Sequence, residues 1–356
     1  MWHKIIAPYC EPATLPTVIA ERCVHTLVTQ ASCRACMDAC PVNAWVMDEE
    51  SLGIDTEACD GCGLCASACP QGAIIPHQAN LPVLSGSRTS ALFACEKAGV
   101  NGKDGIIPCL HALGLQDLLQ LYRSGMRRLC VATGDCASCI RGGVLQLPDL
   151  LEQLTGMLES RNLATITLQV ADREEWNQQS QNAKQSFSGP AISRRAFFRK
   201  AATSSMTVWM DVTRPAEERA FAPPGKLLPR TSRNDVVPFS PRIDSTKCNG
   251  CNACARLCPQ GAIALYSSED ILQYRLDAEC CTGCDICVDV CDQKAVCVDH
   301  WSSQVQFELP LTAHRCRACG VPFHQPSIKT SSCDLCAVCS KTNHARNLFQ
   351  VMEQTH

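Results

Sequence analysis

Several features that mark common protein classes are missing from this sequence. No apolar run approaches the length of a membrane-spanning helix, and the first residues contain no apolar stretch of the signal-peptide kind. No G-x-G-x-x-G segment follows a predicted strand, so we expect flavin or nicotinamide chemistry to belong to a partner protein. The formal net charge of −3 gives no electrostatic reason to expect nucleic acid binding. Only 5% of the residues are aromatic, which fits small cores built around metal centres.

Cysteine is abundant instead, with 29 cysteines in 356 residues. Many of them occur in C-x2-C steps, which are typical of metal sites rather than of disulfides, and we expect a cytoplasmic protein. The clearest group reads Cys59-x2-Cys62-x2-Cys65-x3-Cys69-Pro70, the bacterial ligand run for a [4Fe-4S] cluster. In paired runs the first three thiolates bind one cluster and the fourth binds its neighbour, so this run predicts a partner run.

The partner run lies just upstream, within a first predicted domain at 20–80. It reads Cys33-x2-Cys36-x3-Cys40-Pro41, with Gln30 in place of the leading cysteine. Glutamine is a poor cluster ligand, so we predict that Cys23 replaces it; the alternative is a three-cysteine site with one labile iron, or with no cluster. Cross-ligation then gives a first site of Cys23, Cys33, Cys36 and Cys69, and a second site of Cys59, Cys62, Cys65 and Cys40.

A second domain of the same kind is predicted at 240–300. One run ends in Cys258-Pro259, and the other ends in Cys291-Asp292, where aspartate replaces proline. Spacing favours Cys281 over its neighbour Cys280 as the first ligand of the second run. The predicted third site is Cys248, Cys251, Cys254 and Cys291, and the predicted fourth site is Cys281, Cys284, Cys287 and Cys258. Spacing and flanks together resemble bacterial 2[4Fe-4S] ferredoxins, which implies two α+β dicluster domains and four [4Fe-4S] clusters.

The stretch 88–171 has a different pattern. Strands are expected at 91–95, 106–108, 129–132 and 165–170, with helices at 115–122 and 148–158, which predicts a small parallel α/β domain. Four cysteines follow the carboxyl ends of these strands, where sites of parallel sheets gather: Cys95, Cys109, Cys136 and Cys139. We predict a [2Fe-2S] cluster at this middle site. Zinc, a redox-active dithiol and a purely structural role are the alternatives.

The order of elements in 91–171, together with Gly125-x3-Leu129-x-Val131-x2-Gly134-Asp135-Cys136, resembles the iron–sulfur delta subunit of methyl-viologen-reducing hydrogenase. That family passes electrons between hydrogenase or formate dehydrogenase and heterodisulfide reductase. The resemblance implies an electron-carrier role for this domain. The cysteine spacing differs from that of the family.

The composition of 172–239, rich in Asn, Gln and scattered Pro, predicts a linker. It contains Ser193-Arg194-Arg195, which looks like a twin-arginine export signal. The motif is internal and no apolar run follows it, so we expect a basic amphipathic segment rather than export. Similar openings occur in cytoplasmic ferredoxin-type accessory proteins of nitrate reductase systems.

The tail, 312–345, carries further cysteine pairs that predict a zinc-ribbon-like site. The ligands in this prediction are Cys316, Cys319, Cys333 and Cys336. The closing pair can also be Cys336 with Cys339, and a fifth [4Fe-4S] cluster is the alternative to zinc.

Together these patterns predict a multi-cluster electron-transfer protein that links a dehydrogenase or hydrogenase to a reductase. Clusters with only cysteine ligands leave no open iron for substrate, so we expect no catalytic residue among them. One alternative is an enzyme that reduces disulfides with Cys136 and Cys139. Another is an accessory protein for the maturation of a metalloenzyme.

Overall fold

The computed structural model describes residues 15–47, 52–77, 81–84, 89–141, 147–187, 221–328 and 334–342. Contacts divide the chain into two units, Met1–Thr29 with Arg34–Asp235 and Gln30–Cys33 with Val236–His356. Among the described residues, no helix combines the length and the apolar character that crossing a bilayer requires.

The first unit begins with a small domain built from short elements. Two antiparallel pairs, β1 (Thr17–Val18) with β4 (Ile74–Ile75) and β2 (Trp45–Met47) with β3 (Leu52–Ile54), enclose the cysteine runs. The helical turns are η2 (Ala20–Arg22), α1 (Val24–Leu27), α2 (Ala35–Asp38) and α3 (Leu64–Ala68). α2 and α3 occupy equivalent places in the two runs, as the internal repeat predicts.

A predominantly parallel sheet follows in the same unit. Its strands are β5 (Val83–Leu84), β6 (Ser90–Cys95), β7 (Ile106–Ile107), β8 (Arg128–Ala132) and β9 (Thr167–Val170). β6 pairs in parallel with β7 and β8, and β8 pairs in parallel with β9. Only β5 is antiparallel, along the first part of the β6 edge that β7 joins further on. The predicted parallel α/β arrangement of the middle domain is therefore confirmed.

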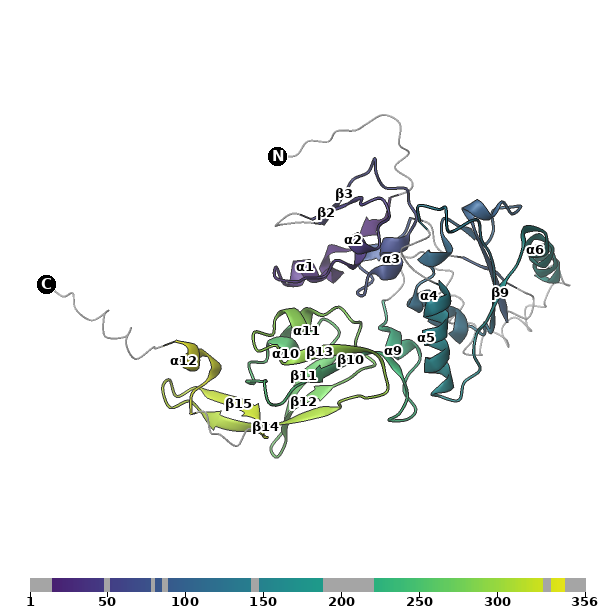
Figure 1. Cartoon of the computed structure of the whole chain (residues 1–356). Helices are drawn as coiled ribbons and strands as arrows, with labels where there is room; N and C mark the ends of the chain where they lie inside the picture. The colour runs from purple at the N-terminus through teal and green to yellow at the C-terminus, as the bar shows by residue number, and fades with distance from the viewer. Residues whose placement is uncertain are drawn as a thin grey trace, which may run out of the picture. The chain divides into compact units, whose positions relative to one another are not determined.

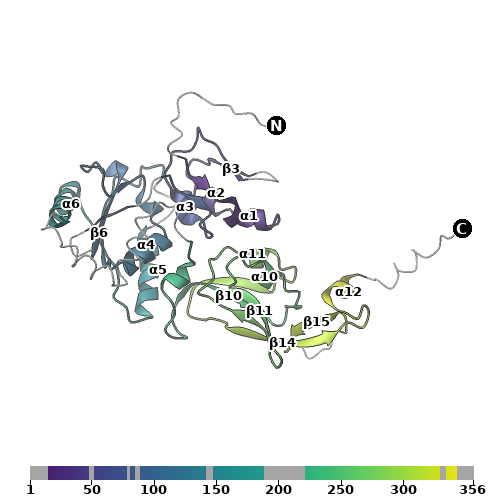
Figure 2. The ribbon, with the colours of Figure 1, turned by 180° about the vertical axis from the view of Figure 1, so that it is seen from behind.

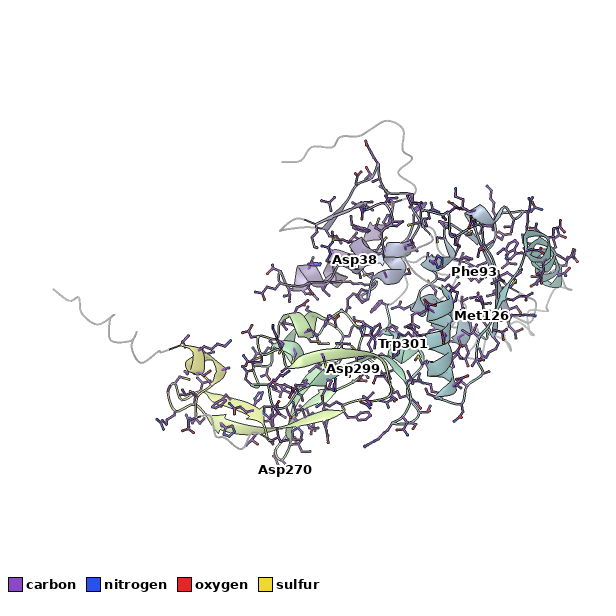
Figure 3. All side chains as sticks on the ribbon, in the orientation of Figure 1. Asp38, Phe93, Met126, Asp270, Asp299 and Trp301 are labelled. Carbon is purple, nitrogen blue, oxygen red and sulfur yellow. The ribbon has the colours of Figure 1, made fainter. Side chains whose placement is uncertain are left out.

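Helices cover both faces of this sheet (Figure 1, Figure 2). α4 (Leu115–Arg123) and α5 (Leu147–Glu159) lie on one face and α6 (Arg173–Phe187) lies on the other. Phe93 and Met126, labelled in Figure 3, are fully buried inside this domain. The short η3 (Glu96–Ala98) and η4 (Leu110–Ala112) follow the ends of β6 and β7.

α6 corrects the predicted linker at 172–239. Trp176 of this helix is fully buried among Leu92, Cys130 and other core residues, and its Nε1–H donates to the Phe93 carbonyl at 3.0 Å. The polar composition reflects only the exposed face of α6. Further along, α9 (Pro224–Leu227) also belongs to the first unit, where the Gln116 side chain donates to the Ala222 carbonyl at 3.1 Å. The twin-arginine-like motif lies in 188–220, outside the described residues.

The second unit holds the other ferredoxin-like domain. β10 (Val237–Ile243) pairs with β13 (Val296–Ser302), and the helical turns α10 (Ala253–Leu257) and α11 (Ile286–Asp289) follow the cysteine loops. A second sheet has the order β11 (Ile263–Ser267), β12 (Leu272–Leu276), β14 (Glu308–Arg315) and β15 (Pro322–Pro326). Because β14 pairs with both β12 and β15, the C-terminal segment is continuous with the ferredoxin-like domain. α12 (Ala337–Lys341) ends the described chain.

Candidate metal centres

The three complete cysteine runs share one backbone turn. In each, the residues before and after the second cysteine have positive φ: Gly61 and Gly63, Gly250 and Asn252, Gly283 and Asp285. Glycine adopts this left-handed conformation without penalty, and Asn and Asp tolerate it better than other residues do. The third cysteine then sits in the first turn of a short helix, as Cys65 does in α3.

The fourth cysteine of every run accepts a backbone hydrogen bond. The N–H of a buried alanine four residues on donates to its Sγ: Ala44 to Cys40 at 3.2 Å, Ala73 to Cys69 at 3.3 Å, Ala262 to Cys258 at 3.1 Å, and Ala295 to Cys291 at 3.2 Å. N–H donors to sulfur stabilise thiolate ligands. Asp292 in place of proline therefore leaves this turn intact.

The predicted second site comes together in the structure. Its four cysteines, Cys40, Cys59, Cys62 and Cys65, line one cavity between Trp45 and Pro76. Burial raises the pKa of Cys65 to about 11, and the nearby thiols of Cys59 and Cys40 add to that rise. Such thiols ionise only when a cation compensates the charge, so the donor set fits an iron–sulfur cluster.

The third and fourth predicted sites also group as cross-ligation requires. Burial raises the pKa of Cys254 to about 12, and the other three members of the third site contribute to the rise. Burial likewise raises the pKa of Cys287, and the other three members of the fourth site contribute again. Cys281 rather than Cys280 is among these neighbours of Cys287, as the spacing predicts.

The first site departs from this pattern in its backbone. Ser32 and Arg34, which correspond to Gly61 and Gly63, are not left-handed, and Arg34 has φ −125°. Cys36 and Cys69 pack against the same small core as Cys65, and Cys23 precedes α1. Cys33 falls within the second unit by its contacts, so the ligand set of this site stays a prediction.

The middle site gathers four cysteines from the carboxyl ends of parallel strands. Cys95 ends β6, Cys109 follows β7, and Cys136 and Cys139 follow β8; all four line a mostly apolar cavity of about 200 Å³. Burial raises the pKa of Cys109, and the thiols of Cys139 and Cys95 contribute to the rise. Four thiols in one small cavity are a donor set that fits a [2Fe-2S] cluster or zinc.

Gly134 lets the chain pass close to the middle site. Its N–H donates to Cys95 Sγ at 3.2 Å, and a Cβ at Gly134 would lie 2.7 Å from the Lys97 carbonyl oxygen. Only glycine therefore allows this approach. Cys130, by contrast, is fully buried on the α6 face of the sheet, so its predicted core role is confirmed.

A four-cysteine site stands at the C-terminus. The Sγ atoms of Cys316, Cys319, Cys336 and Cys339 all lie within 4.8 Å of one another, close enough to hold one metal ion. The Cys336 N–H donates to Cys316 Sγ at 3.3 Å, and this bond lowers the pKa of Cys316 to about 6. The closing pair is thus Cys336 with Cys339. Cys333 is not among the described residues.

Contacts with the third site reach this C-terminal site at two points. Lys341, two residues after Cys339, pairs with Asp292 at 2.8 Å. His324 Nε2 lies 2.8 Å from Asn252 Oδ1, which also accepts the Tyr274 hydroxyl at 2.6 Å. The exchange of proline for aspartate at 292 was a sequence signal for this contact, although no pattern named its partner.

Comparison with known proteins agrees with the cysteine arrangement. Residues 52–75 match the 4Fe-4S binding domain family, and residues 247–295 match the 4Fe-4S dicluster domain family. The chain contains two ferredoxin-type iron–sulfur domains.

Relatives resemble only part of the chain. Over 40 residues it is 58% identical to a tetrathionate reductase subunit of Archaeoglobus fulgidus, which covers 11% of this chain and 19% of that protein. Over 64 residues it is 34% identical to an uncharacterised ferredoxin of Methanocaldococcus jannaschii, which covers 17% of this chain and 39% of that protein. The matches thus span well under half the length of either relative.

Proposed function

We propose that this chain is a cytoplasmic electron-transfer subunit that relays electrons between a dehydrogenase or hydrogenase and a reductase. The observation that carries the proposal is the presence of ferredoxin-type cysteine sites and a further four-cysteine site in one chain. Cys62 of the second site and Cys109 of the middle site even share one buried apolar cluster. The likeness to a reductase subunit and to a ferredoxin supports the same role.

Iron–sulfur clusters, when bound, supply one-electron storage and transfer. The chain's own residues bind and shield them. Buried cysteines such as Cys62 and Cys287 exclude water, and the alanine N–H groups that donate to Sγ stabilise the ligands. We assign four [4Fe-4S] clusters to the four ferredoxin sites, a [2Fe-2S] cluster to the middle site and zinc to the C-terminal site.

The disulfide-reducing alternative receives less support. A reactive dithiol needs a thiol with a depressed pKa. At Cys136 burial raises the pKa, and the nearby thiols of Cys95 and Cys139 and the Asp135 carboxylate contribute to the rise. This environment suits a metal ligand better than a free nucleophile.

Metal content and electron capacity of the anaerobically purified chain test the proposal. Four [4Fe-4S] clusters and one [2Fe-2S] cluster give about 18 iron, about one zinc and about five electrons per chain in a reductive titration. About 16 iron and four electrons would leave the middle cysteines without a cluster. Fewer than about 12 iron would contradict the relay, because more than one ferredoxin site would then be empty.

A further inference from the structure

Arg141 makes more polar contacts near the cysteine sites than its sequence position suggests. Its side chain is only 11% exposed, and its Nε donates to Asp60 Oδ2 at 2.6 Å. One Nη donates to Glu96 Oε1 at 2.7 Å and to the Pro108 carbonyl at 2.9 Å. A guanidinium presents several donors in a fixed plane, so one arginine can hold several acceptors in a defined arrangement.

Each partner of this guanidinium adjoins a cysteine. In the middle site, Glu96 follows Cys95, Pro108 precedes Cys109, and Arg141 itself stands two residues after Cys139. In the second site, Asp60 follows Cys59, and its other oxygen accepts the Cys62 N–H at 3.1 Å. One buried cation therefore contacts the cysteine loop of the second site and three cysteine-bearing segments of the middle site.

The two sites also touch through apolar atoms. Cys62 and Cys109 belong to one buried cluster with Leu64 and Ala112. A Cβ at Gly63 would lie 3.5 Å from Ala112 Cβ, in ordinary van der Waals contact. The second site and the middle site thus meet through packed side chains.

We propose that Arg141 is a positioning residue that holds the second site against the middle site, so that electrons pass between the two domains by way of Cys62 and Cys109. In this transfer one site loses one electron, the other gains it, and no bond or proton changes. The inference rests on the proposed function and names its internal route. The Arg141 charge also favours the reduced, more negative state of both sites.

Variants of the full-length, anaerobically purified protein test this role. Arg141→Gln leaves Asp60 and Glu96 uncompensated, so we expect lower midpoint potentials for both sites and a weaker magnetic interaction between their reduced clusters. Arg141→Lys should give intermediate values. Arg128→Gln is the matched control, because Arg128 begins β8, at the end remote from the cysteines, and its side chain donates to the Ser90 hydroxyl at 2.9 Å. EPR-monitored redox titration measures both quantities, and iron content shows that the clusters are loaded.

Asp60→Asn supplies a second variant in case Arg141→Gln loses its middle cluster. The asparagine keeps an oxygen for the Cys62 N–H but removes the ion pair, so we expect a smaller change in the same direction. Unchanged potentials and unchanged magnetic interaction in fully loaded Arg141→Gln, or in Asp60→Asn if the former loses its cluster, would overturn the inference. A wild-type middle site without a redox-active cluster would overturn it too. The relay through the ferredoxin sites would survive either result if the reductive titration still counts about four electrons.

Discussion

Asp235 is a fully buried carboxylate near the end of the first unit, beyond α9. Its Oδ2 accepts the Thr231 N–H at 2.6 Å and the Ser232 N–H at 2.9 Å, and Arg161 Nε lies 3.9 Å away. Burial alone would raise the pKa of Asp235, but these donors and the Arg161 charge together hold it below its ordinary value. The carboxylate therefore stabilises the fold in its charged form.

We expect Asp235→Asn to lower the free energy of unfolding at neutral pH by about 3 kcal/mol, because it leaves a buried guanidinium without its counter-charge. Urea unfolding followed by circular dichroism measures this. Asp270→Asn is the control, because Asp270 is exposed in the hairpin between β11 and β12 (Figure 3).

The pH dependence follows from the depressed pKa of Asp235. A group with a folded-state pKa below its unfolded value contributes stability above the unfolded value, about 3.9 for aspartate, and loses it as pH falls through the folded value. The difference in unfolding free energy between wild type and Asp235→Asn should therefore shrink below about pH 4. A difference that stays constant from neutral to acidic pH would contradict a charged, hydrogen-bonded Asp235.

Gly250 is required at its position for two separate reasons. Its φ is +75°, and a Cβ there would collide with the His324 carbonyl oxygen in β15. Gly261 has a similar φ of +67°, but a Cβ there would meet nothing within 4 Å. The pair separates backbone strain from close packing.

We expect Gly261→Ala to cost about 1 kcal/mol, the strain of a left-handed alanine, and Gly250→Ala to cost more than that. The excess should come with faster metal loss from the C-terminal site, since β15 must move. Unfolding curves and zinc release to a chromogenic chelator measure both effects. Equal costs for the two variants would show that β15 does not pack on the third site.

At the scale of elements, α6 completes the middle domain. It covers the sheet face formed by Leu92, Ala94, Cys130 and Ala132 of β6 and β8. Without this helix that face would expose apolar side chains to water. α6 is therefore a structural layer of the domain, although its sequence is mostly polar.

Trp176→Ala should destabilise the first unit by about 3–5 kcal/mol, because it removes a large buried side chain. Trp176→Phe should cost less, about 1 kcal/mol, since the ring stays buried and only the bond to the Phe93 carbonyl is lost. Gln181→Ala on the exposed face of α6 serves as the control. Thermal or urea unfolding measures the series, and a Trp176→Ala effect no larger than that of the control would argue against this packing.

At the scale of the whole molecule, the second unit joins a ferredoxin-like domain and a metal-binding tail through one sheet. The order β11-β12-β14-β15 carries the chain from the third site to the C-terminal site without an intervening linker. The exposed Lys341–Asp292 pair contributes little free energy by itself but fixes where α12 lies.

Cysteine variants test which thiols hold the C-terminal metal. Cys339→Ala should lose about one zinc per chain, because Cys339 is one of the four clustered thiols, whereas Cys333→Ala should keep it. Iron content should stay unchanged in both variants. Zinc analysis of the purified proteins decides the matter, and zinc loss in Cys333→Ala alone would restore the other closing pair.

Cysteine spacing carried most of the predictable information about these sites. The second, third and fourth sites follow from runs such as Cys59 to Cys69, because ligand geometry constrains only a few consecutive residues. Strand patterning likewise predicts β6 and β8 and places Cys95 and Cys136 at one sheet edge. The ligands of the first site stay undecided, because Gln30 breaks the local rule and nothing local says what replaces it.

The sequence by itself determined the metal-binding character of the chain and its parallel middle sheet, since both depend on short-range spacing and periodicity. Only the tertiary structure decided that α6 is a layer of the fold, that Cys339 closes the C-terminal site, and that Arg141 joins two sites. These features depend on contacts between residues far apart in sequence, as between Arg141 and Asp60. Such contacts form only after the domains fold, so no local pattern records them.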